Sequence, residues 1–218
     1  MIVNSYGRGT PVTLVAHGLG ATPGEARIPA SGLPGTRKVI TLPSHGEAPD
    51  APPGYWNYPR IARDLASVDA DHAVGVSLGA GALTRLVADQ PNKFRKMALL
   101  LPAVLDQPRE KWTLDQLMDL AQGPPDYLEA RKTALLRLAR AAEELPGQVV
   151  VDETSELAAV TAPVLIIAAT GDPLHPEDVA KATAQAFPNS ELLVLDSPAP
   201  LISHRAVIRK RLVDFFAG

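Results

Sequence analysis

The chain contains no cysteine, and this absence limits its chemistry. Disulfide bonds, cysteine nucleophiles and thiolate metal ligands are all excluded. An excess of one charge is also lacking, since the formal net charge of the 218 residues is −3 and the isoelectric point is about 5.9. Such a balance provides no electrostatic surface for nucleic acid or for an anionic membrane. We therefore expect neither as a partner.

Long apolar runs are missing as well. The longest, around residues 97–101, has the length of a strand rather than of a membrane span. The first ten residues, MIVNSYGRGT, lack a basic region followed by an apolar run, so we expect no signal peptide and a cytoplasmic protein. Aromatic residues make up only 5% of the chain, but 46% of it is hydrophobic. That content and length suit one domain with a sizeable core.

Short apolar runs alternate with helical patterns along most of the chain. Continuous apolar runs are typical of strands that are covered on both faces, as in a parallel sheet. Six runs are predicted as strands, at residues 12–16, 38–42, 72–76, 96–101, 163–169 and 191–195. Helices are predicted at residues 58–68, 78–89, 177–187 and 205–216. This alternation predicts an α/β protein with a mostly parallel, doubly wound sheet flanked by helices.

One region interrupts the alternation. Residues 104–156 carry helical patterns without a convincing central strand. We interpret them as a small helical insertion that lies over the sheet as a lid, within a single domain of residues 1–218.

The strongest functional signal is the sequence Gly75-Val76-Ser77-Leu78-Gly79. It fits the pattern G-x-S-x-G and lies between a predicted strand and a predicted helix, the context of a nucleophile elbow. A serine at so sharp a turn has strained backbone geometry, and its neighbours must lack bulky side chains. The turn also exposes the serine hydroxyl beside the free N–H groups of a helix N-terminus. Ser77 is therefore the candidate nucleophile.

With this elbow, the chain resembles the α/β-hydrolase superfamily from about Thr10 to Phe216. A second matching segment is His17-Gly18-Leu19-Gly20, which is similar to the H-G-x-x loop of that superfamily. The resemblance implies that the backbone N–H groups of Leu19 and Leu78 form the oxyanion hole. It implies structural roles for His17 and for His45, while His72 is expected to be packed at the start of a strand. No metal or organic cofactor is needed.

The acid and the base of the triad are expected late in the chain. The segment Gly171-Asp172-Pro173 resembles the turn that delivers the triad acid in this superfamily, with Asp106 and Asp196 as less favoured acids. Because the residues run in the order serine, acid, histidine, we predict His204 as the base. His204 precedes the last helix in the context Ser203-His204-Arg205 instead of the usual Gly-His, so His175 is held as the reserve base.

These residues predict a serine hydrolase that cleaves a carboxylic ester or a related acyl bond through an acyl-enzyme. Trp112, Tyr55 and Trp56 are expected to contact a small, apolar acyl substrate, with core packing as the alternative for each. Three arginines of the predicted lid helices, Arg131, Arg137 and Arg140, either meet an anionic substrate or form a solvated helix face. Three other functions stay open: hydrolysis of a thioester, lactone or C–C bond; a lyase or cyclase of natural-product metabolism; and a ligand-binding homologue that has lost its base.

Overall fold

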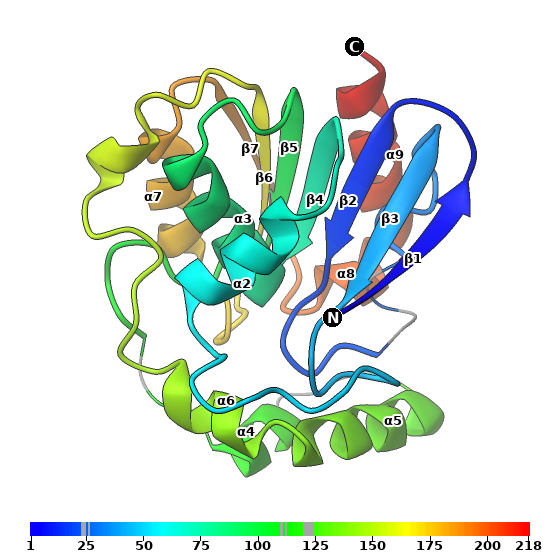
Figure 1. Ribbon diagram of the computed structural model, residues 1–218, viewed down its shortest axis with the longest axis vertical. Helices are drawn as coiled ribbons and strands as arrows, with labels where there is room; N and C mark the ends of the chain where they lie inside the picture. The colour runs from blue at the N-terminus through cyan, green and yellow to red at the C-terminus, as the bar shows by residue number, and fades with distance from the viewer. Residues whose placement is uncertain (23–24, 26, 110, 112, 120–123) are drawn as a thin grey trace.

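A seven-stranded sheet forms the centre of the protein (Figure 1). The computed structural model describes residues 1–22, 25, 27–109, 111, 113–119 and 124–218. The strand order is β1-β3-β2-β4-β5-β6-β7. The strands are β1 (Ile2–Gly7), β2 (Val12–Ala16), β3 (Thr36–Thr41), β4 (His72–Val76), β5 (Lys96–Leu100), β6 (Val164–Ala169) and β7 (Ser190–Leu195).

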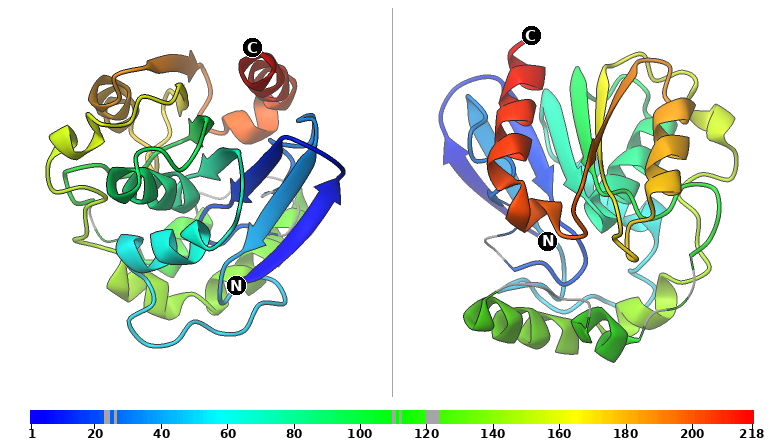
Figure 2. Two further views of the ribbon diagram at one scale, coloured as in Figure 1. Left: turned by 45° about the horizontal axis from the view of Figure 1, so that its top comes forward. Right: turned by 180° about the vertical axis from the view of Figure 1, so that it is seen from behind.

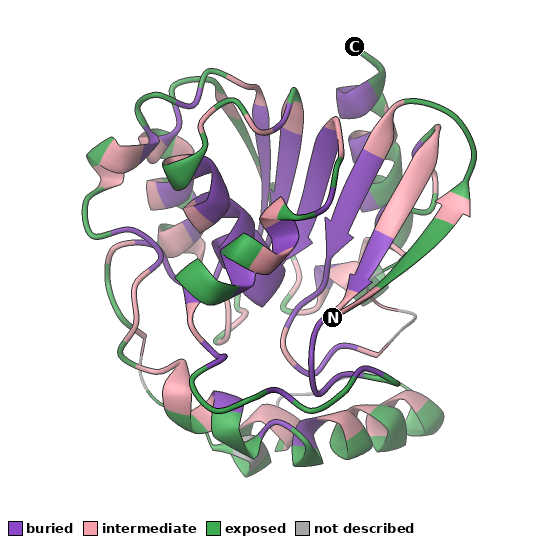
Figure 3. Ribbon diagram, viewed as in Figure 1, coloured by how far each residue is buried: buried purple, intermediate pink, exposed green. Residues whose placement is uncertain are grey.

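Strands β2 to β7 are parallel, and they confirm the six strands and the doubly wound sheet that the apolar runs predict. Strand β1 was not predicted. It pairs antiparallel with β3, from Ile2 opposite Thr41 to Gly7 opposite Thr36. As an edge strand it is only partly buried (Figure 3), so its sequence needs no continuous apolar run.

Helices cover both faces of the sheet (Figure 2). One face packs against α2 (Tyr58–Ala66), α3 (Leu78–Asp89) and α7 (Glu177–Ala186), and the other face packs against α9 (Arg205–Ala217). A 3₁₀ turn, η1 (Thr154–Leu157), precedes β6, and a short helix, α8 (Pro200–Ser203), directly precedes α9. Among the described residues, no helix has the combined length and apolar character that a membrane crossing requires.

Three further helices lie across the end of the sheet at which the parallel strands finish (Figure 1): α4 (Leu114–Asp119), α5 (Pro125–Leu136) and α6 (Ala139–Glu144). They occupy the region that the sequence assigns to a helical insertion. Arg137, at the end of α5, donates hydrogen bonds to the carbonyl of Gly46 at 2.6 Å and to the carboxylate of Asp50. Glu144 accepts the N–H groups of Gly54 and Trp56. These bonds join the insertion to the loop between β3 and α2.

A close backbone contact fixes α3 on the sheet. A Cβ atom at Gly79, in the first turn of α3, would lie 2.5 Å from the carbonyl oxygen of Ala16 in β2. Backbone on both sides leaves no flexible group that could move aside. Only glycine therefore lets α3 begin this close to the central strands.

We predict that Gly79→Ala lowers the free energy of unfolding by roughly 2–3 kcal/mol, the range of overpacked core sites. The matched control is Gly147→Ala, because a Cβ there meets nothing within 4 Å and only the positive φ of 80° opposes the change. That control should cost about 1 kcal/mol. Urea unfolding of both variants measures the difference, and equal losses would contradict the proposed contact.

Candidate active site

Ser77 occupies a sharp turn between β4 and α3. Its φ of 50° and ψ of −112° place a non-glycine residue in a strained backbone conformation. The turn is held because the Ser77 N–H donates to the carbonyl of Leu100 at 2.9 Å and the Ser77 carbonyl accepts the N–H of Gly81 at 3.0 Å. A Cβ at Gly75 would meet the backbone of Gly79 and Ala80 within 2.8 Å. The expected elbow is thus present, with its serine at the carboxyl end of a central strand.

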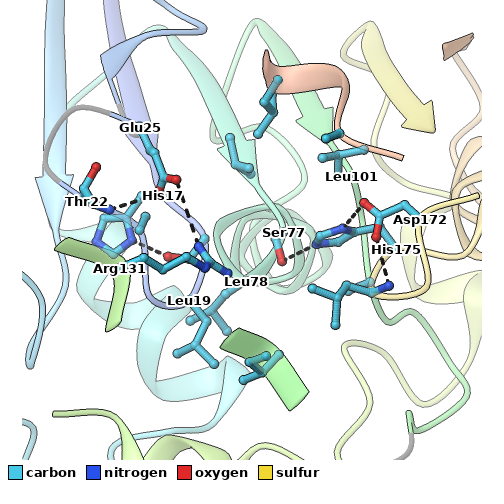
Figure 4. A pocket seen from close by; sticks show the side chains of 18 of the residues that line it. His17, Leu19, Thr22, Glu25, Ser77, Leu78, Leu101, Arg131, Asp172 and His175 are labelled. Atoms are coloured by element: carbon cyan, nitrogen blue, oxygen red, sulfur yellow. Dashed lines mark hydrogen bonds and ion pairs between the residues drawn. The ribbon is translucent and has the colours of Figure 1, made fainter. Parts of the chain in front are cut away.

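The side chain that contacts Ser77 is His175 (Figure 4). Its Nε2 lies 2.9 Å from Ser77 Oγ, and its Nδ1 lies 2.7 Å from Asp172 Oδ2. Asp172 and His175 both belong to the turn that follows β6, where the His175 N–H also donates to the Asp172 carbonyl at 3.3 Å. Their side chains are only 9% and 14% exposed, respectively. Serine, imidazole and carboxylate therefore form a continuous chain of hydrogen bonds.

The environment of Asp172 keeps its carboxylate ionised. Burial raises its pKa, but the hydrogen bond and charge of His175 and the N–H of Leu174, at 2.9 Å from Oδ1, together lower the pKa below its ordinary value. A carboxylate at Nδ1 favours the tautomer with a proton on that nitrogen. Nε2 is then free to accept the proton of the Ser77 hydroxyl.

His204 does not lie beside Ser77, which corrects the sequence expectation about its position. It is the residue between α8 and α9, and its N–H and carbonyl both take part in helical hydrogen bonds, with Pro200 and Ile208. Its Nδ1 is 2.9 Å from Ser203 Oγ. The superfamily pattern has a loop before the last helix, whereas here two helices follow each other and hold His204 in place. The less favoured acid Asp196 accepts the hydroxyl of Thr170 instead.

The two expected oxyanion-hole residues both lie on the side of Ser77 that faces away from His175 (Figure 4). Leu78 is the first residue of α3, Leu19 follows β2, and both line the cavity that contains Ser77 (Figure 4). Among the hydrogen bonds of the described residues, neither backbone N–H has an acceptor in the protein. A Cβ at Gly18 would lie 3.2 Å from Ser77 Cβ, which shows how closely the loop approaches the serine.

Two buried histidines hold this loop in place. His17 Nδ1 lies 2.7 Å from the carbonyl of Gly18, and its Nε2 accepts the N–H of Leu42 at 3.0 Å. His45 Nε2 accepts the N–H of Gly20 at 2.9 Å, and the two imidazole rings are 4.4 Å apart. Burial lowers the pKa of His17 to about 4, and burial with the charge of His17 lowers that of His45 to about 3. Both rings are neutral at pH 7.

The aromatic residues expected at the cavity mouth occupy other places. Tyr55 and Trp56 are only 2% and 1% exposed and belong to the hydrophobic core. Trp56 contacts the His45 ring edge to face at 5.9 Å, and the Tyr55 hydroxyl donates to Asp64. Trp112 lies outside the described residues. Tyr58, the first residue of α2, does line the cavity.

The cavity around Ser77 has a volume of about 500 Å³. Its walls are mainly apolar and come from the loop after β2, from the helical insertion and from the segment around α8. On the far side from His175, the hydroxyl of Tyr127 donates to Glu25, and Arg131 lies 4.0 Å from the same carboxylate (Figure 4). Of the three arginines that the sequence offers for an anionic substrate, Arg131 thus lines the cavity, whereas Arg137 and Arg140 bond to the loop between β3 and α2.

A mostly parallel, seven-stranded sheet that is flanked by helices and has a strained serine in the turn after a central strand is consistent with the α/β-hydrolase fold. The sequence-based resemblance to this superfamily is confirmed at the level of the fold. In the described residues, no cluster of three or more histidine, aspartate or glutamate side chains could hold a metal ion.

Comparisons with known proteins agree. Residues 138–216 match the family described as TAP-like protein. The fold is similar to that of an esterase from Exiguobacterium antarcticum, with 16% identity, a TM-score of 0.80, and coverage of 99% of this chain and 95% of the other. It is also similar to an enol-lactonase from Burkholderia xenovorans LB400, with 19% identity, a TM-score of 0.79, and coverage of 100% and 96%. Comparison with curated proteins gives no match.

We predict that the His17–His45 pair makes the fold sensitive to acid. In the unfolded chain both histidines have the ordinary pKa of 6.5, whereas in the folded protein their pKa values are about 4 and 3. Below pH 6.5 the unfolded chain therefore binds protons that the folded protein does not bind. The contribution of the pair to stability is present above pH 6.5 and is lost as the pH falls below it. By pH 5 each histidine should cost on the order of 2 kcal/mol. Urea unfolding at pH 8 and pH 5 measures the decrease in the free energy of unfolding. In His45→Gln only His17 remains, so the part of the decrease that comes from the pair should be roughly half of the wild-type value. An equal loss in wild type and variant would contradict the assignment.

Proposed function

We propose that the protein is a serine hydrolase that uses Ser77 as nucleophile, His175 as general base and Asp172 as the group that orients His175. The observation that carries the proposal is the hydrogen-bond chain from Ser77 Oγ through both nitrogens of His175 to Asp172. A serine hydroxyl is a weak nucleophile unless a base removes its proton as it attacks.

The reaction proceeds in two halves. Ser77 Oγ attacks the carbonyl carbon of an ester while its proton passes to His175 Nε2, and the N–H groups of Leu19 and Leu78 stabilise the oxyanion. His175 then gives the proton to the leaving alcohol, which departs and leaves Ser77 acylated. Water attacks the acyl-enzyme, His175 takes its proton and returns it to Ser77, and the carboxylic acid is released.

The helices α4 to α6 act as a lid in this proposal. They lie over the carboxyl ends of the strands, where Ser77 and His175 emerge, and they supply one wall of the mainly apolar cavity. A small to medium apolar acyl group fits a cavity of about 500 Å³. The same residues would serve a thioester or a lactone, and one similar structure is an enol-lactonase. A ligand-binding homologue without a base is disfavoured by the contact between His175 and Ser77.

We predict that a fluorophosphonate probe labels wild-type protein at Ser77 and fails to label Ser77→Ala. His175→Gln should slow labelling by roughly 10³-fold or more, because no other base replaces the imidazole. Asp172→Asn should also slow it strongly, because the imidazole then loses its required tautomer. Intact-mass spectrometry over time measures the rates.

The matched control is His204→Gln, which should label at the wild-type rate. Slow labelling of this variant together with normal labelling of His175→Gln would show that the base is His204 after all. A wild-type protein that does not label at Ser77 would sink the whole proposal.

A further inference from the structure

The charges that line the cavity do not balance. Its described walls contain two carboxylates, Glu25 and Asp172, and three guanidinium groups, Arg109, Arg131 and Arg205. Both carboxylates are already bound, Asp172 by His175 and Glu25 by Tyr127 and Arg131. Among the described residues, neither Arg109 nor Arg205 has a carboxylate within ion-pair distance. A surplus of positive charge therefore faces the space around Ser77.

Arg109 is the less exposed of these two arginines. It follows β5, is half-buried, and lines the same cavity as Ser77. Burial lowers the pKa of its guanidinium, while the negative charges of ionised Tyr58 and Asp172 would raise it, so these two groups are its electrostatic neighbours. Within the described part of the chain, it makes neither a hydrogen bond nor an ion pair. A guanidinium removed from water without a partner is costly, and an anionic ligand would offset that cost.

Tyr58 offers a second donor in the same place. It is buried, it lines the cavity, and its hydroxyl has no hydrogen-bond partner among the described residues. Burial raises the pKa of Tyr58 to about 12, so the hydroxyl keeps its proton at neutral pH. The ring packs on Gly81 of α3, where a Cβ would lie 2.6 Å from Tyr58 Cε1. The absence of a side chain at residue 81 thus leaves room for the tyrosine.

We propose that Arg109 and Tyr58 form an anion subsite beside Ser77, and that the substrate carries a carboxylate at the end of an apolar acyl chain. This inference rests on the proposed hydrolase function and names its substrate class. The planar guanidinium can donate two parallel hydrogen bonds to a carboxylate, and the phenol can donate a third. The apolar walls of the cavity accommodate the chain between the carboxylate and the scissile carbonyl.

The test compares esters that differ only in the terminal group. The 4-nitrophenyl monoesters of glutaric and pimelic acid are matched with 4-nitrophenyl pentanoate and heptanoate, and the rate without enzyme is subtracted. We expect wild type to show at least a roughly tenfold higher kcat/KM on one carboxylate-bearing ester than on its neutral match. Arg109→Gln should lower that ratio about tenfold or more, and Arg109→Lys by less.

The control is Arg95→Gln. Arg95 precedes β5 at the opposite end of the sheet, and its side chain is 81% exposed, so the ratio should stay at the wild-type value. Thermal unfolding of each variant checks that it folds. Equal or faster hydrolysis of both neutral esters by wild type would overturn the subsite, and so would an unchanged ratio in Arg109→Gln.

A binding measurement separates this inference from the proposed function. Calorimetry on Ser77→Ala needs no turnover, and it should show tighter binding of monomethyl pimelate, which carries a carboxylate, than of neutral methyl heptanoate, with an affinity for the former that falls as salt rises. If wild type cleaves none of the four esters and Ser77 does not label, the hydrolase proposal fails, yet the calorimetric preference still tests the subsite. Equal binding of the two methyl esters would refute the subsite on its own.

Discussion

The site depends on one hydrogen bond, between Ser77 Oγ and His175 Nε2, which joins residues 98 positions apart. Ser77 follows β4 and His175 follows β6, with β5 between them. Neighbouring strands lie about 4.8 Å apart, so the turn after β6 must reach across roughly 10 Å at the end of the sheet. Parallel pairing makes this possible because it brings the carboxyl ends of all three strands to the same edge. The elbow after β4, the turn after β6 and the parallel pairing of the strands between them must therefore all be in place for Ser77 and His175 to meet.

Asp172 and His175 share one turn, and this placement affects the rest of the cavity. The segment after β7 does not supply the histidine that contacts Ser77. It forms α8 instead, and Pro200, Leu201 and Ile202 of this helix form an apolar wall of the cavity. The loop after β2 is in turn fixed by neutral, buried imidazoles rather than by charge, so the N–H groups beside Ser77 are held without a competing cation. Among the described residues, the cavity arginines without a carboxylate partner are Arg109 and Arg205.

Most of the fold could be predicted from the sequence, because strands buried on both faces leave continuous apolar runs. The exposed edge strand β1 leaves none, and it was missed. The elbow was equally predictable, since Gly75 and Gly79 are required by backbone contacts within one short motif. The identity of the histidine that contacts Ser77 could not be predicted in the same way, because His175 and His204 both follow Asp172 in the chain and residue order alone does not distinguish them. The spacing of three residues between Asp172 and His175 was the sequence feature that could have favoured His175. Trp56 was misplaced because a large aromatic residue in a loop suits a cavity mouth and a core equally well.

In the proposed mechanism, His175 is the base for Ser77, and the N–H groups of Leu19 and Leu78 face the developing oxyanion. A crystal structure of the protein after reaction with a fluorophosphonate tests this arrangement most directly. We predict a phosphonyl group on Ser77 Oγ, with His175 Nε2 within hydrogen-bond distance of the substituted oxygen and the two N–H groups bound to a phosphoryl oxygen. An adduct on another residue, or an adduct on Ser77 with His204 in place of His175, would contradict the account.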